Sequence, residues 1–307
     1  MNIEQSIANE LGVKLSQVEA TITLIDGGST VPFISRYRKE VTGGLDDTQL
    51  RTLEERLYYL RELEDRRATV LKTIEEQGKL TDELKKSILE ADTKTRLEDL
   101  YAPYKLKRRT KAQIAREAGI EPLLDAILED RSLDPNVAAE PYINAEAKFA
   151  DIEAVLGGAR QIFMERAAEN ADLLAELRDT CWEKGELIST VVKGQENKGS
   201  KFTDYFEFSE KIKKIPSHRA LALFRGRNEG ILRVKLSIPG QDDLESPLDM
   251  GICDSLVAHA FSLSQKQRAA DNWLLESARW AWRVKISMTL ESESNLRSRE
   301  SADEEAI

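Results

Sequence analysis

The feature that most constrains this fold is a long run of regularly spaced apolar residues between Asp46 and Gly78. No glycine or proline interrupts the run. A helix of roughly 30 residues would be about 45 Å long, longer than a small helical domain is wide, so other elements must pack along it. The apolar positions recur every three or four residues, which is the period of one helix face: Leu50, Leu53, Leu57, Leu60, Leu63, Val70, Leu71 and Ile74.

Local signals predict where this helix begins and ends. Asp46 and Gln49 stand three residues apart, which is the spacing of a capping box, and Asp47 adds negative charge to the first turn. Gly78 suits the left-handed position that commonly follows a helix. We expect the long helix to be a spine inside the molecule rather than the seam of a coiled-coil dimer, because helices are predicted on both sides of it.

Composition favours a helical, soluble protein of the cytoplasm. The 307 residues include 41% hydrophobic and 33% charged residues, but only 8 prolines and 16 glycines. No apolar run approaches the roughly 18 residues of a membrane span. The two cysteines, Cys181 and Cys253, lie far apart and in no metal-ligand spacing. A net charge of −10 confines any nucleic-acid surface to local patches.

The predicted fold is mainly α and multi-helical, with a small antiparallel β element around residues 187–238. Two β-branched segments, 187–194 and 231–238, are expected to pair there. Gly157-Gly158 predicts a kink or a break in the helix that contains it. The loose connector near residue 130 divides the chain into residues 1–130 and residues 131–307, the latter ending in Trp-rich helices.

The first 26 residues carry the spacing of a helix-turn-helix motif. Ala8, Gly12 and Val18 occupy the positions of the small residue, the turn and the apolar lock. The second helix contains Glu19 and Asp26, whereas a helix that enters the major groove needs positive charge. A structural helical pair is therefore favoured over a DNA-reading motif.

Three basic segments are candidate nucleic-acid contacts. The first surrounds Tyr37, the second leads into a helix capped by Thr110, and the third is a short Gly-bounded helix near three phenylalanines. Phosphate contact and plain pairing with neighbouring acids are both open for the second segment, and structural contact is favoured for the third. The candidate residues are Arg36, Arg38, Lys39, Lys105, Lys107, Arg108, Arg109, Lys111, Arg116, Arg219, Arg225 and Arg227.

Signals for catalysis are poor. Neither His218 nor His259 lies in a triad or metal-ligand pattern, and no phosphate-binding or dinucleotide fingerprint occurs. The paired carboxylates Asp46-Asp47 begin a helix, and Asp242-Asp243 lie in a turn. We therefore expect no enzyme activity, no cofactor and no metal.

Four segments carry a resemblance to a known family: residues 32–47, 53–67, 97–123 and 215–232. In order and content they resemble the N-terminal half of Tex, a bacterial transcription accessory protein family related to a eukaryotic transcription elongation factor. The similarity covers nearly the whole chain. It implies a helical region that precedes a YqgF/RNase H-like domain, helix-hairpin-helix motifs and an S1 domain, all of which are expected to be absent from this chain.

The expected function is that of an N-terminal scaffold in a Tex-like factor, without catalysis. Nucleic acid is the expected partner, bound weakly, without sequence preference and with sensitivity to salt. The transcription machinery and the following domains of the same protein are further expected partners, and a membrane is not. The alternative is a pure protein–protein interaction module that uses the long helix and the Trp-rich segment.

Overall fold

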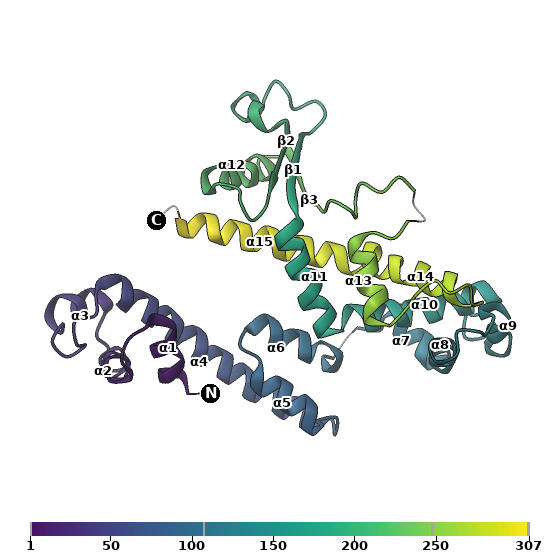
Figure 1. The fold of residues 1–307 in the computed structure, drawn as a ribbon, viewed down its shortest axis with the longest axis horizontal. Coiled ribbons are helices and arrows are strands. Elements are labelled where there is room, and N and C mark those ends of the chain that lie inside the picture. The colour runs from purple at the N-terminus through teal and green to yellow at the C-terminus, as the bar shows by residue number, and fades with distance from the viewer. Residues whose placement is uncertain (1, 107, 247–248, 306–307) are drawn as a thin grey trace. The chain divides into compact units, whose positions relative to one another are not determined.

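The computed structural model describes residues 2–106, 108–246 and 249–305. As expected, the protein is mainly α-helical with one small antiparallel sheet (Figure 1). The chain divides into an N-terminal unit that ends at Lys105 and a C-terminal unit that begins at Leu106. The division lies earlier than the expected boundary near residue 130, because the helices between residues 111 and 129 pack against helices of the C-terminal unit.

One long helix organises the N-terminal unit. Figure 1 shows α1, α2 and α3 beside the first half of α4, and α5 and α6 beside its second half. This arrangement covers the whole length of α4 with short helices. The elements are α1 (Ile3–Leu11), α2 (Leu15–Asp26), α3 (Val31–Tyr37), α4 (Asp47–Glu76), α5 (Asp82–Glu90) and α6 (Lys94–Tyr101).

The spine helix begins and ends as its sequence predicts. The Asp46 side chain accepts a hydrogen bond from the Gln49 backbone N–H at 2.8 Å, and the Gln49 side chain accepts one from the Asp46 N–H at 3.1 Å. After 30 residues the helix stops before Gly78, whose φ of 68° is left-handed. The buried face consists of the expected apolar residues, with Leu71 half-buried beside them: Leu50, Leu53, Leu57, Leu60, Leu63, Val70 and Ile74.

A buried cation on the spine holds the second half of the unit together. Arg67 is only 2% exposed, and its guanidinium donates to the backbone carbonyls of Ile88 and Ala91 at the end of α5. The same side chain pairs with Glu64 one turn earlier on α4. A buried charge is tolerated where hydrogen bonds and an opposite charge satisfy it, so Arg67 fixes the end of α5 on α4.

The helix pair α1–α2 packs on the spine through both apolar and ionic contacts. Gly12, with φ of 65°, makes the turn between the two helices. Glu10 pairs with Arg56 of α4 at 2.6 Å, and Asp26 pairs with Arg61 of α4 at 2.7 Å. These contacts favour the structural interpretation of the helix-turn-helix spacing.

The C-terminal unit is built around α10, which packs against α7, α8, α9, α14 and a π-helical turn. That turn, Ala281–Ile286, joins two helices into one continuous helical run. The expected Trp-rich helix is therefore present, with an extra residue inserted into its ladder. The helices are α7 (Lys111–Glu117), α8 (Glu121–Glu129), α9 (Pro135–Ala139), α10 (Ile152–Ala168), α11 (Ala171–Lys184), α12 (Ser217–Asn228), α13 (Ile252–Ala260), α14 (Asp271–Trp280) and α15 (Ser287–Glu305).

The expected break at Gly157-Gly158 is wrong, because α10 runs through both glycines without interruption. Packing explains the second glycine. A Cβ at position 158 would lie 2.8 Å from the Phe149 ring, 3.1 Å from the Ile120 side chain and 3.2 Å from the Ala115 Cβ. Gly158 therefore permits the close approach of these residues to α10, and tertiary contacts outweigh its low helix propensity.

The sheet confirms the expected strand pairing and adds a strand that the sequence did not indicate. Its order is β2-β1-β3, and both pairings are antiparallel, with Leu187 opposite Leu236 of β3 and opposite Glu210 of β2. Buried residues of the sheet pack with Leu223 and Phe224 of α12. The strands are β1 (Glu186–Val191), β2 (Glu207–Lys211) and β3 (Leu232–Ser237).

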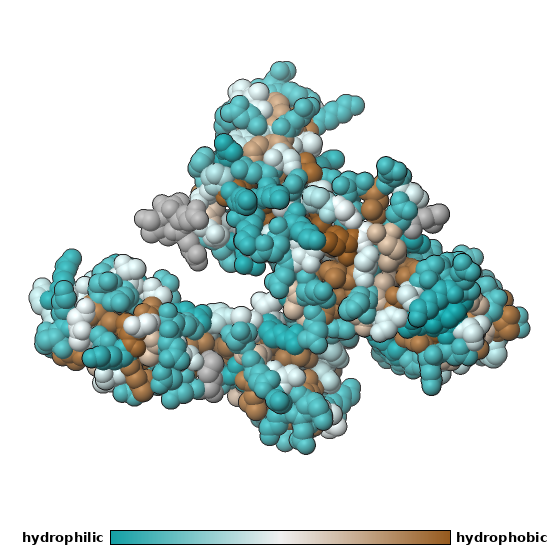
Figure 2. Space-filling model, in the orientation of Figure 1, coloured by the Kyte–Doolittle hydropathy of each residue, from teal (hydrophilic) through white to brown (hydrophobic). Residues whose placement is uncertain are grey.

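The surface is mostly polar on the face that Figure 2 draws. Hydrophilic residues cover most of it, and apolar residues show where α11, α13 and α15 lie close together. Within the described ranges, no helix is both long and apolar enough to cross a membrane.

The two glycines of α10 should respond to alanine in opposite directions. A Cβ at Gly157 meets nothing within 4 Å, so Gly157→Ala should raise the free energy of unfolding by about 0.5–1 kcal/mol through helix propensity. Gly158→Ala should lower it by about 1–3 kcal/mol through overpacking against Phe149. Urea unfolding followed by circular dichroism measures both variants. Equal effects at the two positions would contradict the packing explanation.

Candidate nucleic-acid interface

The structure places the candidate cations in three separate settings. Arg36, Arg38 and Lys39 lie on or just after α3, in the N-terminal unit. The segment that begins at Arg108 and the helix α12 belong to the C-terminal unit. Lys107 lies outside the described residues.

The α3 segment presents its cations beside exposed aromatic rings. Arg36, Arg38 and Lys39 are all exposed, and none makes an ion pair with a described residue. The Arg38 guanidinium lies 5.6 Å from the centre of the Phe33 ring, and the Phe33 and Tyr37 rings lie 5.3 Å apart. This surface combines positive charge with exposed aromatic rings.

The turn after α3 is held firmly from inside the unit. Thr42 is fully buried, and its hydroxyl donates to the Lys39 carbonyl at 3.2 Å. Gln17 of α2 donates to the carbonyls of Thr42 and Gly43, at 3.4 and 3.0 Å. These bonds restrain the backbone on which the exposed cations stand.

Lys105 is engaged in a different part of the same unit. Its ammonium pairs with Glu98 of α6, which also accepts from Arg66 of α4 at 2.6 Å. The hydrogen bond from Arg66, helped by Lys105 and opposed by burial, holds the pKa of Glu98 below its usual value. Arg66 lies about 28 Å along α4 from Asp47, beside which α3 packs. The structure thus does not bring Lys105 together with Arg36.

Two cations of the second basic segment, Arg109 and Arg116, are paired with acids of their own unit. The Thr110 side chain accepts from the Gln113 N–H at 3.0 Å, as the capping prediction requires, and its hydroxyl donates to Glu165 at 3.1 Å. Arg109 pairs with Glu117, its Nε at 3.0 Å from the carboxylate. Pairing with neighbouring acids, one of the two open interpretations, therefore describes Arg109.

Arg116 is likewise held in place. It reaches the nearly buried Glu165 at 2.5 Å and Glu121 at 3.1 Å. Arg108 and Lys111, in contrast, are exposed and make no ion pair with a described residue. Among the described residues of the second segment, Arg108 and Lys111 are therefore left for an external anion.

The third segment is divided in the same way. Arg219 pairs with Glu210 of β2 at 3.0 Å, whereas Arg225 is exposed without an acid partner among the described residues. The Arg227 guanidinium lies 5.2 Å from the Phe224 ring, but Phe224 itself is only 3% exposed. Its ring belongs to the core and is closed to an incoming base.

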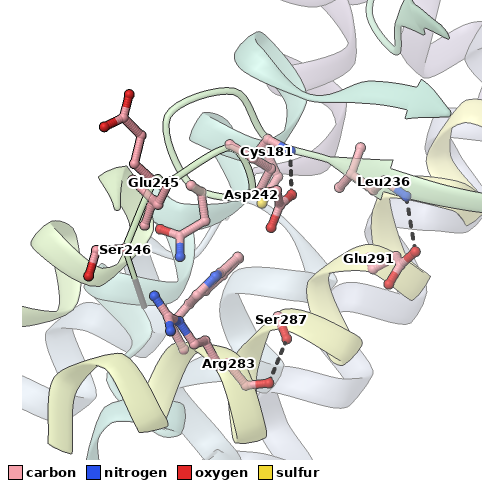
Figure 3. A pocket seen from close by; sticks show the side chains of 12 residues that line it. Cys181, Leu236, Asp242, Glu245, Ser246, Arg283, Ser287 and Glu291 are labelled. Atoms are coloured by element: carbon pink, nitrogen blue, oxygen red, sulfur yellow. Dashed lines mark hydrogen bonds between the residues drawn. The ribbon is translucent and has the colours of Figure 1, made fainter. Parts of the chain in front are cut away.

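A cavity of about 550 Å³ lies between α11, β3 and α15 (Figure 3). Two of the acids that line it bind the backbone: Asp242 accepts a hydrogen bond from the Ile238 N–H at 2.7 Å, and Glu291 accepts one from the Leu236 N–H at 3.0 Å. Arg283 reaches the buried Asp254 at 3.2 Å. These groups hold the walls of the cavity in position, and none is placed as an acid–base pair.

The two cysteines meet in space although they are distant in the sequence. Both are buried and free, and Cys181 borders the cavity. A hydrogen bond with Cys181, together with burial, raises the pKa of Cys253 well above its usual value, which keeps this thiol neutral and unreactive. No cluster of His, Cys, Asp or Glu suited to a metal occurs in the part of the chain that the structure describes.

Comparison with known proteins identifies the family. A model described as "Tex-like protein N-terminal domain" matches residues 1–75, and one described as "Tex central region-like" matches residues 130–307. The chain belongs to the Tex family. The family models thus include the α3 segment and α12 but not the second basic segment.

Relatives in this family are similar to the chain along nearly its whole length. Protein YhgF of Escherichia coli is 52% identical over 98% of this chain and 39% of its own length. Protein tex of Bordetella pertussis is 52% identical over 98% of this chain and 38% of its own length. Transcriptional accessory protein Tex of Neisseria gonorrhoeae is 50% identical over 100% of this chain and 40% of its own length. The chain therefore spans about two fifths of the length of these relatives.

Neither Phe33 nor Glu165 was predicted from the sequence to contribute to the candidate interface. Phe33 had a signal, because it stands four residues before Tyr37 and thus on the same helix face. Glu165 had none, since its contact with Arg116 joins residues 49 positions apart.

Glu121 forms ion pairs with Arg116 and Arg166. These pairs should make the free energy of unfolding depend on pH. Burial opposes ionisation of Glu121, but hydrogen bonds from Arg166 and Arg116 outweigh it and lower the pKa of this carboxyl. The ionised Glu121 carboxylate stabilises the fold above its pKa in the unfolded chain, about 4.3. This stabilisation is lost as the pH falls through the lower pKa of Glu121 in the folded chain. Glu121→Gln should therefore flatten the fall in unfolding free energy below about pH 4.5.

Urea unfolding at a series of pH values measures this dependence. Glu146→Gln is the matched control, because Glu146 is exposed and makes no ion pair with a described residue. A pH profile of Glu121→Gln that follows the parent chain would show that the bridge does not stabilise the fold.

Proposed function

We propose that this chain is the scaffold region of a Tex-like transcription accessory factor, and that it contacts nucleic acid weakly through local cations. The observation that carries the proposal is the group formed by Arg36, Arg38 and Lys39. These three residues are exposed, close together and without an acid partner among the described residues. The names of the relatives, which include a transcriptional accessory protein, support the setting.

The proposed contact is electrostatic and reads no sequence. Cations that meet phosphates release the counterions condensed on the nucleic acid, which makes affinity fall as salt rises. Arg108, Lys111 and Arg225 are exposed in the C-terminal unit and are available for further contacts of this kind. Paired cations such as Arg109 and Arg219 contribute less, because an acid already neutralises each of them.

A role without catalysis is part of the proposal. Asp242 and Glu291, the acids that line the cavity and receive backbone hydrogen bonds, are committed to structure. The bacterial cytoplasm, where transcription takes place, is the proposed location. Turnover of a nucleic acid that a single carboxylate substitution abolishes would overturn the non-catalytic part of the proposal.

One observation favours the alternative of a protein-interaction module. Trp280, Val284 and Met288 stand four residues apart along the helical run and are 43%, 53% and 69% exposed. An apolar row of this kind suits contact with another protein or domain. An electrophoretic shift at low salt separates the two functions, since a chain that binds neither RNA nor DNA there would leave only the alternative.

Replacing Arg36, Arg38 and Lys39 together by glutamine should weaken binding and reduce its salt dependence. Each phosphate contact on a single strand contributes about 0.7 to the slope of log affinity against log salt, so the loss of three contacts should lower the slope by about 2. Fluorescence anisotropy with a labelled oligonucleotide between 50 and 200 mM salt measures this slope.

The control replaces Lys72 and Lys86, two exposed lysines of α4 and α5 that each have a glutamate one turn away. This double variant should bind as the parent does. If the triple variant also keeps the parental affinity and slope, the α3 segment is not the contact. Matched pairs at Arg108 with Lys111 and at Arg225 with Arg227 then test the other two segments.

A further inference from the structure

The outer face of α3 exposes aromatic rings that the fold does not need. Val31 and Ile34 supply the buried face of this helix, at 2% and 0% exposure. Phe33 and Tyr37, on the solvent-facing side of the helix, remain 41% and 62% exposed. Among the described residues, Tyr37 is the most exposed aromatic side chain. Because the two rings lie side by side, they form a contiguous exposed patch, which is typical of an interaction site.

The two rings form one surface with the cations around them. Phe33, Arg36 and Tyr37 stand at positions i, i+3 and i+4, which share a face of the helix. The ring planes of Phe33 and Tyr37 are tilted by 45° at 5.3 Å, and Arg38 lies over Phe33 at 5.6 Å. A planar, π-rich ligand that carries negative charge would match both halves of this surface.

The backbone of this surface is also held in place before a ligand binds. The buried Thr42 and the two hydrogen bonds from Gln17 hold the turn that carries Arg38 and Lys39. Gly43 and Gly44, both at positive φ, let the chain leave the turn sharply toward α4. Less ordering is therefore needed when a ligand binds.

We propose that Tyr37 and Phe33 stack on the bases of single-stranded nucleic acid, while Arg36, Arg38 and Lys39 meet its phosphates. This inference rests on the proposed function and names its ligand. Single strands expose base faces, whereas a duplex covers them, so rings of this kind are useful only against unpaired bases. Charge complementarity favours nucleic acid over a protein partner, because the only acid from residue 32 to residue 44 is Glu40.

The test measures binding of the whole chain to 12-nucleotide oligo(dT) and oligo(U) and to a duplex of equal length. Tyr37→Ala should weaken single-strand binding about tenfold, the scale on which one base–aromatic stack contributes. The salt slope and the duplex affinity should stay unchanged. Tyr37→Phe should bind as the parent, whereas Tyr37→Leu, which keeps apolar area but no ring, should behave like Tyr37→Ala. Phe33→Ala tests the second ring in the same way.

Tyr58→Ala is the matched control, because Tyr58 is 52% exposed on α4 and should not affect binding. An oligonucleotide that carries 2-aminopurine adds a direct signal, since its fluorescence should change on binding to the parent and change less on binding to Tyr37→Leu. Thermal unfolding confirms that each variant is folded.

The outcomes separate this inference from the function on which it rests. If Tyr37→Ala and Phe33→Ala bind single strands as the parent does, while the triple charge variant binds more weakly, stacking is overturned and electrostatic contact remains. If Tyr37→Leu retains parental affinity, apolar area rather than an aromatic ring is the requirement, and stacking is overturned. If neither the ring variants nor the triple charge variant changes the affinity for oligonucleotides, both the stacking and the electrostatic contact at α3 are overturned.

Discussion

The N-terminal unit depends on covering an apolar stripe that is longer than any helix available to cover it. The stripe extends along the 30 residues of α4, whereas the helices that pack on it have between 7 and 12 residues. Each partner can therefore bury only part of the stripe. This distribution places α3 near the start of α4 with its apolar side inward, and it leaves the opposite side, with Phe33 and Tyr37, in solvent.

Charge pairing then decides which cations remain for a ligand. The chain has 55 acidic and 45 basic residues, so a cation on a helix that packs against others commonly meets an acid. Arg56 and Arg61 pair with α1 and α2, and Arg116 pairs with α8 and α10. Arg36, Arg38 and Lys39, in contrast, have no acid partner among the described residues. Availability of charge is thus a property of position in the fold rather than of local composition.

The sequence predicts those parts of the structure whose causes are local. The capping box of Asp46 with Gln49 and the left-handed Gly78 lie within a few residues of the helix ends that they determine. The strand β2 has a single half-buried apolar residue, Phe208, and forms because β1 offers it an edge. From the sequence alone, Gly158 predicts a break in the helix, because the residues that pack against it are distant in the chain. In the candidate interface, Glu165 and Glu210 neutralise arginines from positions that no local pattern indicates.

The net charge of −10 determines how such a surface can work. At low ionic strength the Debye length reaches about 30 Å, and the whole acidic chain then repels a polyanion even while local cations attract it. At physiological salt this length falls to about 8 Å, which removes most of the repulsion but also weakens each phosphate contact. Contacts between rings and bases are not screened in this way. An acidic chain therefore gains most from placing its unpaired cations beside exposed aromatic side chains, which is the arrangement of Arg38 beside Phe33 and Tyr37 at the end of α3.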